Sequence, residues 1–283
     1  MNEAWTIRKI LAWSNEYLQK NSIDSPKVTS QLLLCSVLKI PRLNLFLDID
    51  RILSNTELAS YKQYIIRRVN HEPLEYILGE TDFIGHKVFV SPKVLIPRPE
   101  TELLVQETIN ELKKITHKDL VIIDIGTGSG CIALSVKSEF PGAQVWASDI
   151  SLPALEVAKV NAQSHNVSVN FYNGFFPSEL KSVKDLIIVS NPPYIQSEVI
   201  GTLMPEVKDH EPKLALDGGK DGLDIIWQIL DIFYQTQAKH LLMEIGYDQG
   251  LEISSKFKTE KLVGELSIIK DYNNLDRIVK ISK

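Results

Sequence analysis

The stretch Leu120-Val121-Ile122-Ile123-Asp124-Ile125-Gly126-Thr127-Gly128-Ser129-Gly130 decides the fold expected for this chain. It begins as an apolar run that ends on an acid, a pattern typical of a buried parallel strand. The glycines that follow have the spacing G-x-G-x-G, and glycine lets the backbone approach a ligand where a Cβ would clash. The sequence therefore predicts a strand that opens into a ligand-binding turn and then a helix over residues 131–140.

Strand and helix patterns alternate after this turn, which predicts a mostly parallel sheet covered on both faces by helices. Further strands are expected at residues 144–148, 167–172, 185–190, 241–245, 264–269 and 277–281. The last two are expected to form an antiparallel hairpin, because no helix of sufficient length separates them. A sheet of this kind resembles the α/β, Rossmann-like class I methyltransferase fold.

An acid at the end of the second strand points to the ligand. Asp149 follows the glycine turn by about twenty residues, where a carboxylate can accept hydrogen bonds from both hydroxyls of a ribose. Dinucleotide enzymes usually carry G-x-G-x-x-G, with a pyrophosphate at the helix N-terminus. The shorter spacing, with Asp124 just before the turn, favours a nucleoside cofactor without phosphate that carries an ammonium and a sulfonium group. We therefore expect S-adenosyl-L-methionine, with Phe175 either packing on its adenine or serving as a core aromatic.

The tetrapeptide Asn191-Pro192-Pro193-Tyr194 directly follows the apolar run 185–190. Two prolines remove two backbone N–H groups and fix two φ angles, so the carbonyls of Asn191 and Pro192 can be held toward a cleft. The side-chain oxygen of Asn191 adds an acceptor and Tyr194 adds an aromatic face. The pattern suits a planar NH₂ group, although Asn-Pro and Pro-Pro also occur in ordinary turns.

The region before the sheet predicts a separate module. Apolar residues at helical spacing indicate a small helical bundle over residues 1–72, with one helix opening at Ser25-Pro26 and another at Ser54, where Glu57 completes a capping box. Residues 73–99 are expected to form a β-hairpin linker, and residues 100–283 the main domain. The bundle is either a stabilising appendage or a docking module. Arg98 stands between two prolines that stiffen its loop, and is either a functional residue or a surface charge.

The net charge, the apolar runs and the cysteine and histidine content of the chain argue against several classes of function. A formal net charge of -5 argues against a strongly basic nucleic-acid surface. No apolar run reaches the roughly 18 residues needed to cross a bilayer, and the N-terminus lacks the features of a signal peptide, so a cytoplasmic location is expected. Cys35 and Cys131 are too few for a disulfide framework, and the six histidines lack metal-ligand spacing. We therefore expect that the protein does not associate with a membrane, does not bind a metal and does not bind nucleic acid directly.

Taken together, the motifs resemble the HemK-type glutamine methyltransferases that modify peptide chain release factors. The likeness runs over nearly the full length, through 97–102, 124–130, 191–194, Glu211-Pro212, 215–219, 221–223 and Glu244-Ile245-Gly246. It implies a class I methyltransferase domain preceded by a small helical bundle that helps to dock class 1 release factors. It also implies that S-adenosylmethionine is bound by Gly126, Thr127, Gly128, Ser129, Gly130, Asp149, Phe175 and Asn191.

The resemblance further implies that the tetrapeptide holds the substrate glutamine, with Asn191, Pro192 and Tyr194 as catalytic residues. Arg98, Pro193 and those three are the expected substrate contacts. Two positions depart from the family pattern: Gly174 stands where an acidic residue is common, and Asn274 where glycine is usual. Because asparagine tolerates the left-handed conformation, the turn at Asn274 is expected to survive.

The same motifs leave other activities open. An adenine or cytosine amino-methyltransferase would use similar acceptors, but needs base flipping and a basic channel. A ribosomal-protein glutamine methyltransferase is a second alternative, and a catalytically silent adaptor that binds release factor is a third. The expected reaction is transfer of a methyl group to the side-chain amide nitrogen of the glutamine in a Gly-Gly-Gln motif.

Overall fold

The computed structural model describes residues 4–115 and 120–283, and the chain divides into two compact units. The helical unit comprises Met1–Gly79 and Met204–His210, and the sheet unit comprises Glu80–Leu203 and Glu211–Lys283. The sequence predicts a boundary at residue 72, whereas the helical unit runs to Gly79. The reason is α5 (Leu74–Leu78), whose apolar side chains pack against the core of that unit.

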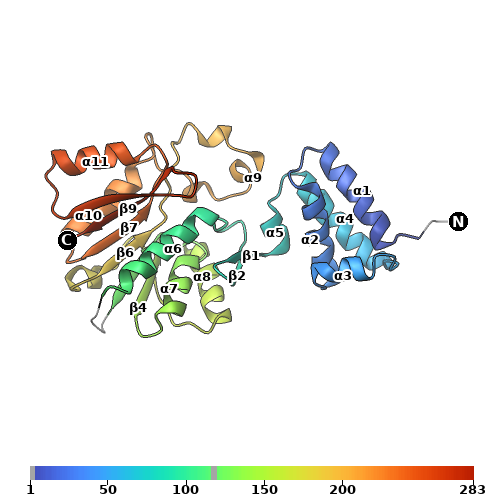
Figure 1. Ribbon diagram of the computed structural model, residues 1–283, viewed down its shortest axis with the longest axis horizontal. Helices are drawn as coiled ribbons and strands as arrows, with labels where there is room; N and C mark the ends of the chain where they lie inside the picture. The colour runs from blue at the N-terminus through green and yellow to red at the C-terminus, as the bar shows by residue number, and fades with distance from the viewer. Residues whose placement is uncertain (1–3, 116–119) are drawn as a thin grey trace. The chain divides into compact units, whose positions relative to one another are not determined.

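The helical unit is built from α1 (Ile7–Lys20), α2 (Pro26–Leu38), α3 (Arg42–Leu47), α4 (Asn55–Val69) and α5 (Figure 1). Its core contains the fully buried Ile7, Leu33 and Tyr61. The capping box at α4 is confirmed, since Ser54 and Glu57 exchange side-chain and backbone hydrogen bonds. The helix expected to open at Ser25-Pro26 begins there as α2, but Ser25 adopts a left-handed conformation and its side chain makes no capping hydrogen bond.

A segment distant in the sequence completes the helical unit. Met204–His210 contains the short helix α9 (Pro205–Lys208). Glu206 of this helix forms an ion pair with Arg68 of α4, whose residue is only 3% exposed. Arg68 also donates to the carbonyl of Glu72, and the ring of His210 lies 3.2 Å from the carbonyl of Asn70. Residues 203 and 211, which flank the segment in the chain, belong to the sheet unit, so the contacts of the segment with α4 and the residues after it, and not its chain neighbours, assign it to the helical unit.

The sheet unit contains a hairpin and a seven-stranded sheet. Within residues 73–99, the range expected to form a hairpin linker, β1 (Glu80–Phe83) pairs antiparallel with β2 (His86–Phe89), and this hairpin belongs to the sheet unit. The large sheet has the order β5-β4-β3-β6-β7-β9-β8. Its strands are β3 (Val121–Ile125), β4 (Gln144–Asp149), β5 (Asn170–Asn173), β6 (Ile187–Ser190), β7 (His240–Glu244), β8 (Glu265–Lys270) and β9 (Asp276–Ser282).

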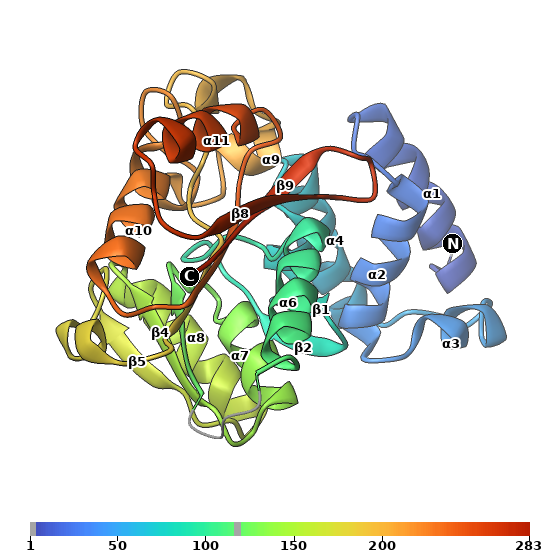
Figure 2. The ribbon, with the colours of Figure 1, turned by 60° about the vertical axis from the view of Figure 1, so that its left-hand side comes forward.

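Helices cover both faces of this sheet (Figure 2). On one face, α10 (Asp224–Gln235) and α11 (Gly250–Thr259) bury apolar side chains against β3, β6 and β7. The other face carries α6 (Pro99–Leu112), α7 (Cys131–Glu139) and α8 (Leu152–Ser164), which follow one another side by side. Short 3₁₀ helices lie at Ser178–Ser182, Ile200–Thr202 and Lys213–Ala215.

The strand directions confirm the expected class I methyltransferase fold. Pairs from β5 through β7 are parallel, whereas β9 runs antiparallel to both β7 and β8. Ile125 pairs with Ser148 and with Ser190, so β3, β4 and β6 end at one edge. The strand expected at 167–172 begins only at Asn170, after a turn in which Asn166 has a positive φ. No helix among residues 4–115 and 120–283 is long and apolar enough to cross a membrane.

Candidate active site

A cavity opens at the carboxyl ends of β3, β4, β5 and β6, the edge where open α/β sheets bind their ligands. It brings together the glycine turn, the acid after β4, the aromatic after β5 and the start of the tetrapeptide. These predicted residues line it: Gly126, Thr127, Gly128, Ser129, Asp149, Phe175, Asn191, Pro192 and Pro193. Other lining residues are Pro97, Thr101, Leu214, Ala215 and Asp217.

The glycine turn is held in place by backbone hydrogen bonds, two to the neighbouring strand β4 and one within the turn. The N–H groups of Gly126 and Thr127 both donate to the carbonyl of Ser148 on β4, and Gly130 donates to Thr127. Gly130 has φ +81°, and a Cβ there would lie 3.0 Å from the Cβ of Ala158. A side chain at this position would therefore strain the backbone and press on α8, which explains the last glycine of the motif.

Asp124 lies beneath the turn and is fully buried. Its Oδ2 accepts a 2.6 Å hydrogen bond from the hydroxyl of Thr127. Burial raises the pKa of Asp124 to about 7, although the hydrogen bond from Thr127 opposes that rise. The carboxyl group thus ties the strand to the turn that follows it.

Asp149 presents its carboxylate to the cavity with both oxygens oriented by the backbone. Gly128 donates to Oδ2 at 2.9 Å and Ser151 donates to Oδ1 at 2.8 Å. Burial raises the pKa of Asp149, and these two N–H groups lower it. Each oxygen keeps a further lone pair, so the group can accept two hydroxyls of a ribose. This donor and acceptor set fits the nucleoside part of S-adenosylmethionine.

Phe175 and Ile150 supply apolar walls beside Asp149. The carbonyl of Phe175 accepts from the hydroxyl of Ser148, which fixes that loop to β4. Gly174 has φ +147°, and a Cβ there would come within 2.6 Å of Cε1 of Tyr172. An acidic side chain at position 174 would therefore require Tyr172 to move, and here the ring of Tyr172 takes that space.

The tetrapeptide contributes Asn191, Pro192 and Pro193 to the cavity. Nδ2 of Asn191 donates a 2.9 Å hydrogen bond to Oγ1 of Thr101, at the start of α6. The next segment braces the backbone: Ile195 donates to Leu216, and Gly218 donates to Ile195. The position of Asn191 is therefore fixed by the hydrogen bond of its side chain and by the backbone hydrogen bonds of the segment that follows it.

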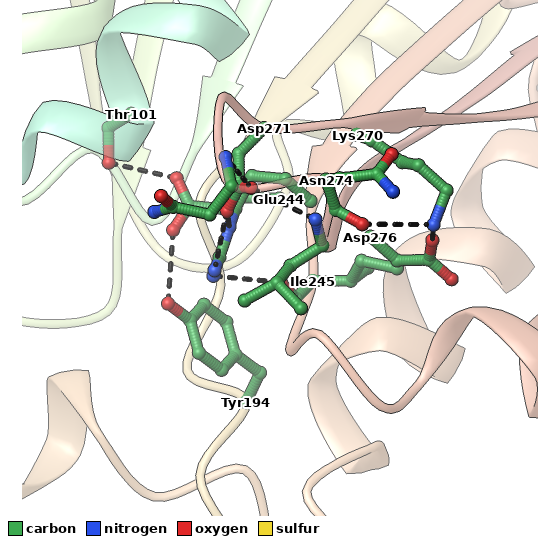
Figure 3. Close-up of polar contacts among 11 residues, drawn as sticks. Thr101, Tyr194, Glu244, Ile245, Lys270, Asp271, Asn274 and Asp276 are labelled. Carbon is green, nitrogen blue, oxygen red and sulfur yellow. Dashed lines mark hydrogen bonds and ion pairs between the residues drawn. The ribbon is translucent and has the colours of Figure 1, made fainter.

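Tyr194 is directed away from the expected position beside a substrate amide. Its hydroxyl donates to Oε1 of Glu244 at 3.0 Å (Figure 3). Burial is the main cause that raises the pKa of Tyr194. Its ring packs against the core cluster of the sheet unit, whereas the three residues before it line the cavity.

Arg98 stands at the N-cap of α6, between Pro97 and Pro99. Its guanidinium forms an ion pair with Glu211, a side chain that is only 1% exposed. Pro97 lines the cavity, so the pair lies on a loop that borders the site. The carboxylate partner accounts for the placement of Arg98 and for the Glu211-Pro212 motif.

Sequence reasoning assigned no role to Thr101 or Glu244, although both belong to the quoted motifs. Glu244 ends β7, is fully buried, and accepts a 2.8 Å hydrogen bond from Thr101 as well as the bond from Tyr194. An acid that directly follows the apolar run 241–243, with a glycine two residues further on, is the signal that points to such a strand-end site.

Two family models match the chain. Residues 9–79 match the PrmC N-terminal domain, and residues 99–209 match the methyltransferase small domain. The release factor glutamine methyltransferase of Geobacter sulfurreducens is 36% identical over 279 residues, covering 98% of this chain and 96% of the relative. That of Bacillus cereus (strain ATCC 14579) is 34% identical over 278 residues, covering 96% and 98%.

Solved structures agree on the fold. The N-terminal domain of human METTL16 in complex with SAH has a TM-score of 0.52 at 17% identity, covering 95% of this chain and 94% of that chain. The hMettl16 catalytic domain in complex with MAT2A 3'UTR hairpin 1 has a TM-score of 0.56 at 13% identity, covering 83% and 84%. At such identities the likeness concerns the fold alone.

Near-complete coverage of relatives at 36% and 34% identity, with the cavity described above, shows that the chain belongs to the release factor glutamine methyltransferases, a family of S-adenosylmethionine-dependent enzymes.

Proposed function

We propose that this protein transfers a methyl group from S-adenosylmethionine to the side-chain amide nitrogen of the glutamine in the Gly-Gly-Gln motif of class 1 release factors. The observation that carries the proposal is the shared cavity: Asn191 and Pro192 line the same space as Asp149 and the glycine turn. Acceptors for an amide and acceptors for a nucleoside are thus brought together, as methyl transfer between the two requires.

The amide acceptors address the main chemical difficulty of the reaction. An amide nitrogen is a poor nucleophile, because its lone pair is delocalised into the carbonyl. When bound, S-adenosylmethionine supplies an electrophilic methyl group on a sulfonium. The side-chain oxygen of Asn191 and the carbonyl of Pro192 accept the two N–H bonds of the glutamine amide, and so orient its lone pair toward the methyl group. The same acceptors stabilise the positive charge that develops on nitrogen.

No strong general base is needed in this scheme. Once methylated, the amide nitrogen carries an extra proton and is acidic enough to release it to water or a nearby carbonyl. Catalysis then rests on alignment and on charge stabilisation by fixed acceptors. Tyr194 contributes by anchoring the tetrapeptide to Glu244, a bond that holds the turn on the sheet.

The helical unit is proposed to dock the release factor. The match to the PrmC N-terminal domain covers residues 9–79, which is nearly the whole first segment of that unit. Its surface supports a protein-binding role, because α3 exposes Leu43, Phe46 and Leu47. The formal net charge of -5 also suits a protein substrate better than a nucleic acid.

The proposal is tested by presenting substrates of each class. The protein is incubated with radiolabelled S-adenosylmethionine and, in separate reactions, with a release factor, ribosomal proteins and DNA. We expect label on the release factor. Label only on a ribosomal protein or on DNA would overturn the proposed substrate.

Asn191→Ala tests the role of the tetrapeptide in the same assay. Loss of one hydrogen bond to the reacting amide is expected to raise the activation free energy by about 1 to 3 kcal/mol, which lowers kcat. Asn110→Ala is the matched control, because Asn110 lies exposed on α6 and its side chain donates a hydrogen bond to Glu107 of the same helix. Near-wild-type turnover of Asn191→Ala with intact cofactor binding would refute the assignment.

A further inference from the structure

The side chain of Thr101 is hydrogen-bonded to the amide of Asn191, and Glu244 is hydrogen-bonded to Thr101 in turn. We propose that they are positioning residues, which fix the Asn191 side chain so that its oxygen faces the substrate glutamine and its NH₂ group faces the protein. The inference rests on the proposed function and deepens it, since it assigns two further residues to the same reaction.

The three side chains form a continuous series of hydrogen bonds. Oε2 of Glu244 accepts from Oγ1 of Thr101 at 2.8 Å, and Oγ1 of Thr101 accepts from Nδ2 of Asn191 at 2.9 Å. Figure 3 shows Thr101 and Tyr194 on either side of the Glu244 carboxylate, one at each oxygen. Glu244 and Thr101 are both buried. Thr101 and Asn191 line the cavity.

Counting donors fixes the direction of every bond in the series. An ionised carboxylate can only accept, so the single hydroxyl proton of Thr101 must point to Glu244. Oγ1 of Thr101 is then left as an acceptor toward Asn191. The amide of asparagine donates only through nitrogen, so Nδ2 must face Thr101 and Oδ1 must face away from it. The charge on Glu244 therefore determines which atom of Asn191 is presented to the substrate.

Reversal of the amide would remove the catalytic acceptor. With Nδ2 turned to the cavity, Asn191 would offer N–H donors to the N–H donors of the glutamine amide, and the two groups would repel.

The buried carboxylate of Glu244 destabilises the fold, because burial disfavours the charged form. Two hydroxyl donors, Thr101 and Tyr194, offset part of that cost.

Burial is the largest influence on the pKa of Glu244 and raises it, whereas the hydrogen bonds from Thr101 and Tyr194 lower it. Among the charged groups nearby, Arg277 on β9, which also pairs with Asp271, lowers this pKa, and Glu100 on α6 raises it. Protonated Glu244 can donate to Thr101, which frees the Thr101 hydroxyl to donate to Oδ1 of Asn191. The wrong amide orientation then becomes available as the pH falls.

The experiment compares hydroxyl variants on one helix. Thr101→Val removes the middle of the series, and Thr101→Ser restores its hydroxyl. Thr108→Val is the matched control, because Thr108 is also buried on α6, and its hydroxyl donates to the carbonyl of Leu104 of its own helix. For Thr101→Val we expect kcat on a release factor to fall by about 10- to 100-fold with little change in cofactor Kd, and Thr101→Ser to recover most of it.

Glu244→Gln supplies the second measurement. Its amide can donate to Thr101, so kcat is expected to fall by about the same factor, and the double variant with Thr101→Val should lose little more. The decline of wild-type kcat at low pH should also flatten in Glu244→Gln.

Three results would overturn the inference: Thr101→Val with the kcat of Thr108→Val, failure of Thr101→Ser to recover turnover, or additive losses in the double variant. In each of these the wild type still methylates the release factor, so the proposed function stands. If the wild type labels no glutamine, the proposed function fails and the inference fails with it.

Discussion

Asp149 is the residue on which cofactor affinity should depend most directly. Asp149→Asn keeps the shape of the side chain, but places an NH₂ group against one of the backbone donors, Gly128 or Ser151. We expect the Kd for S-adenosylmethionine to rise by about 10- to 100-fold, as for loss of hydrogen bonds to a charged acceptor. Calorimetric titration measures the change, with the exposed Asp231→Asn on α10 as control. Equal affinities in the two variants would contradict the assignment.

The same carboxylate predicts a pH dependence of cofactor binding. Burial raises the pKa of Asp149 above the ordinary value, and the deprotonated form is the one that accepts ribose hydroxyls. Affinity should therefore be highest at neutral pH and should fall as the pH drops through the raised pKa. This acidic decline should disappear in Asp149→Asn. Tighter binding at lower pH in the wild type would show that the carboxylate is not an acceptor for the ligand.

Single residues show what a sequence can and cannot reveal about a site. Asp149 was predictable because its spacing from the glycine turn places it at the same sheet edge. The roles of Thr101 and Glu244 were not, because their hydrogen bond joins residues 143 apart and depends on how α6 lies against β7. Left-handed backbone at Asn274 is predicted from its amino-acid type and is confirmed by a φ of +61°.

At the scale of elements, the segment after the 3₁₀ helix Lys213–Ala215 braces the tetrapeptide. A Cβ on Gly218 would lie 2.8 Å from the carbonyl oxygen of Pro193 and 2.8 Å from Cα of Tyr194. Both are backbone atoms that cannot move aside without moving the turn. We expect Gly218→Ala to cost about 1 to 3 kcal/mol of stability and to lower kcat, because the turn that carries Asn191 is displaced.

Gly142→Ala is the matched control for that variant. Its Cβ would meet no atom within 4 Å, and its φ is not in the positive range. Thermal unfolding and methyl transfer are measured for both variants. A Gly218→Ala protein as active and as stable as Gly142→Ala would show that close packing at residue 218 does not set the position of the tetrapeptide.

Long elements with strong patterns were predictable, and short or non-local ones were not. Each of the seven large-sheet strands overlaps an expected strand, most closely β3, β6 and β7, because buried parallel strands concentrate apolar residues. The helices α3, α5 and α9 span six, five and four residues, which is too short for a helical period to be recognised. Packing of Met204–His210 with the helical unit depends on tertiary contacts that no local pattern encodes.

For the whole molecule, the segment Met204–His210, which follows the tetrapeptide in the chain, belongs to the proposed docking unit. Glu206→Ala would leave the buried guanidinium of Arg68 without its carboxylate partner. We expect a loss of about 1 to 3 kcal/mol from the stability of the helical unit, and faster amide hydrogen exchange within residues 204–210. The exposed Glu198→Ala is the control, and exchange that is unchanged from that control would refute a stabilising role for the ion pair.

The central claim, that the cavity methylates a release-factor glutamine, is tested most directly by mass spectrometry of the product. A release factor is incubated with the protein and S-adenosylmethionine, digested, and its Gly-Gly-Gln peptide is fragmented. We predict a mass gain of one methyl group on the glutamine side chain, and an initial rate of this gain that falls by roughly 5- to 150-fold when Asn191→Ala replaces the wild type at equal concentration. An unmodified Gly-Gly-Gln peptide, with methylation on another residue or another substrate, would contradict the claim.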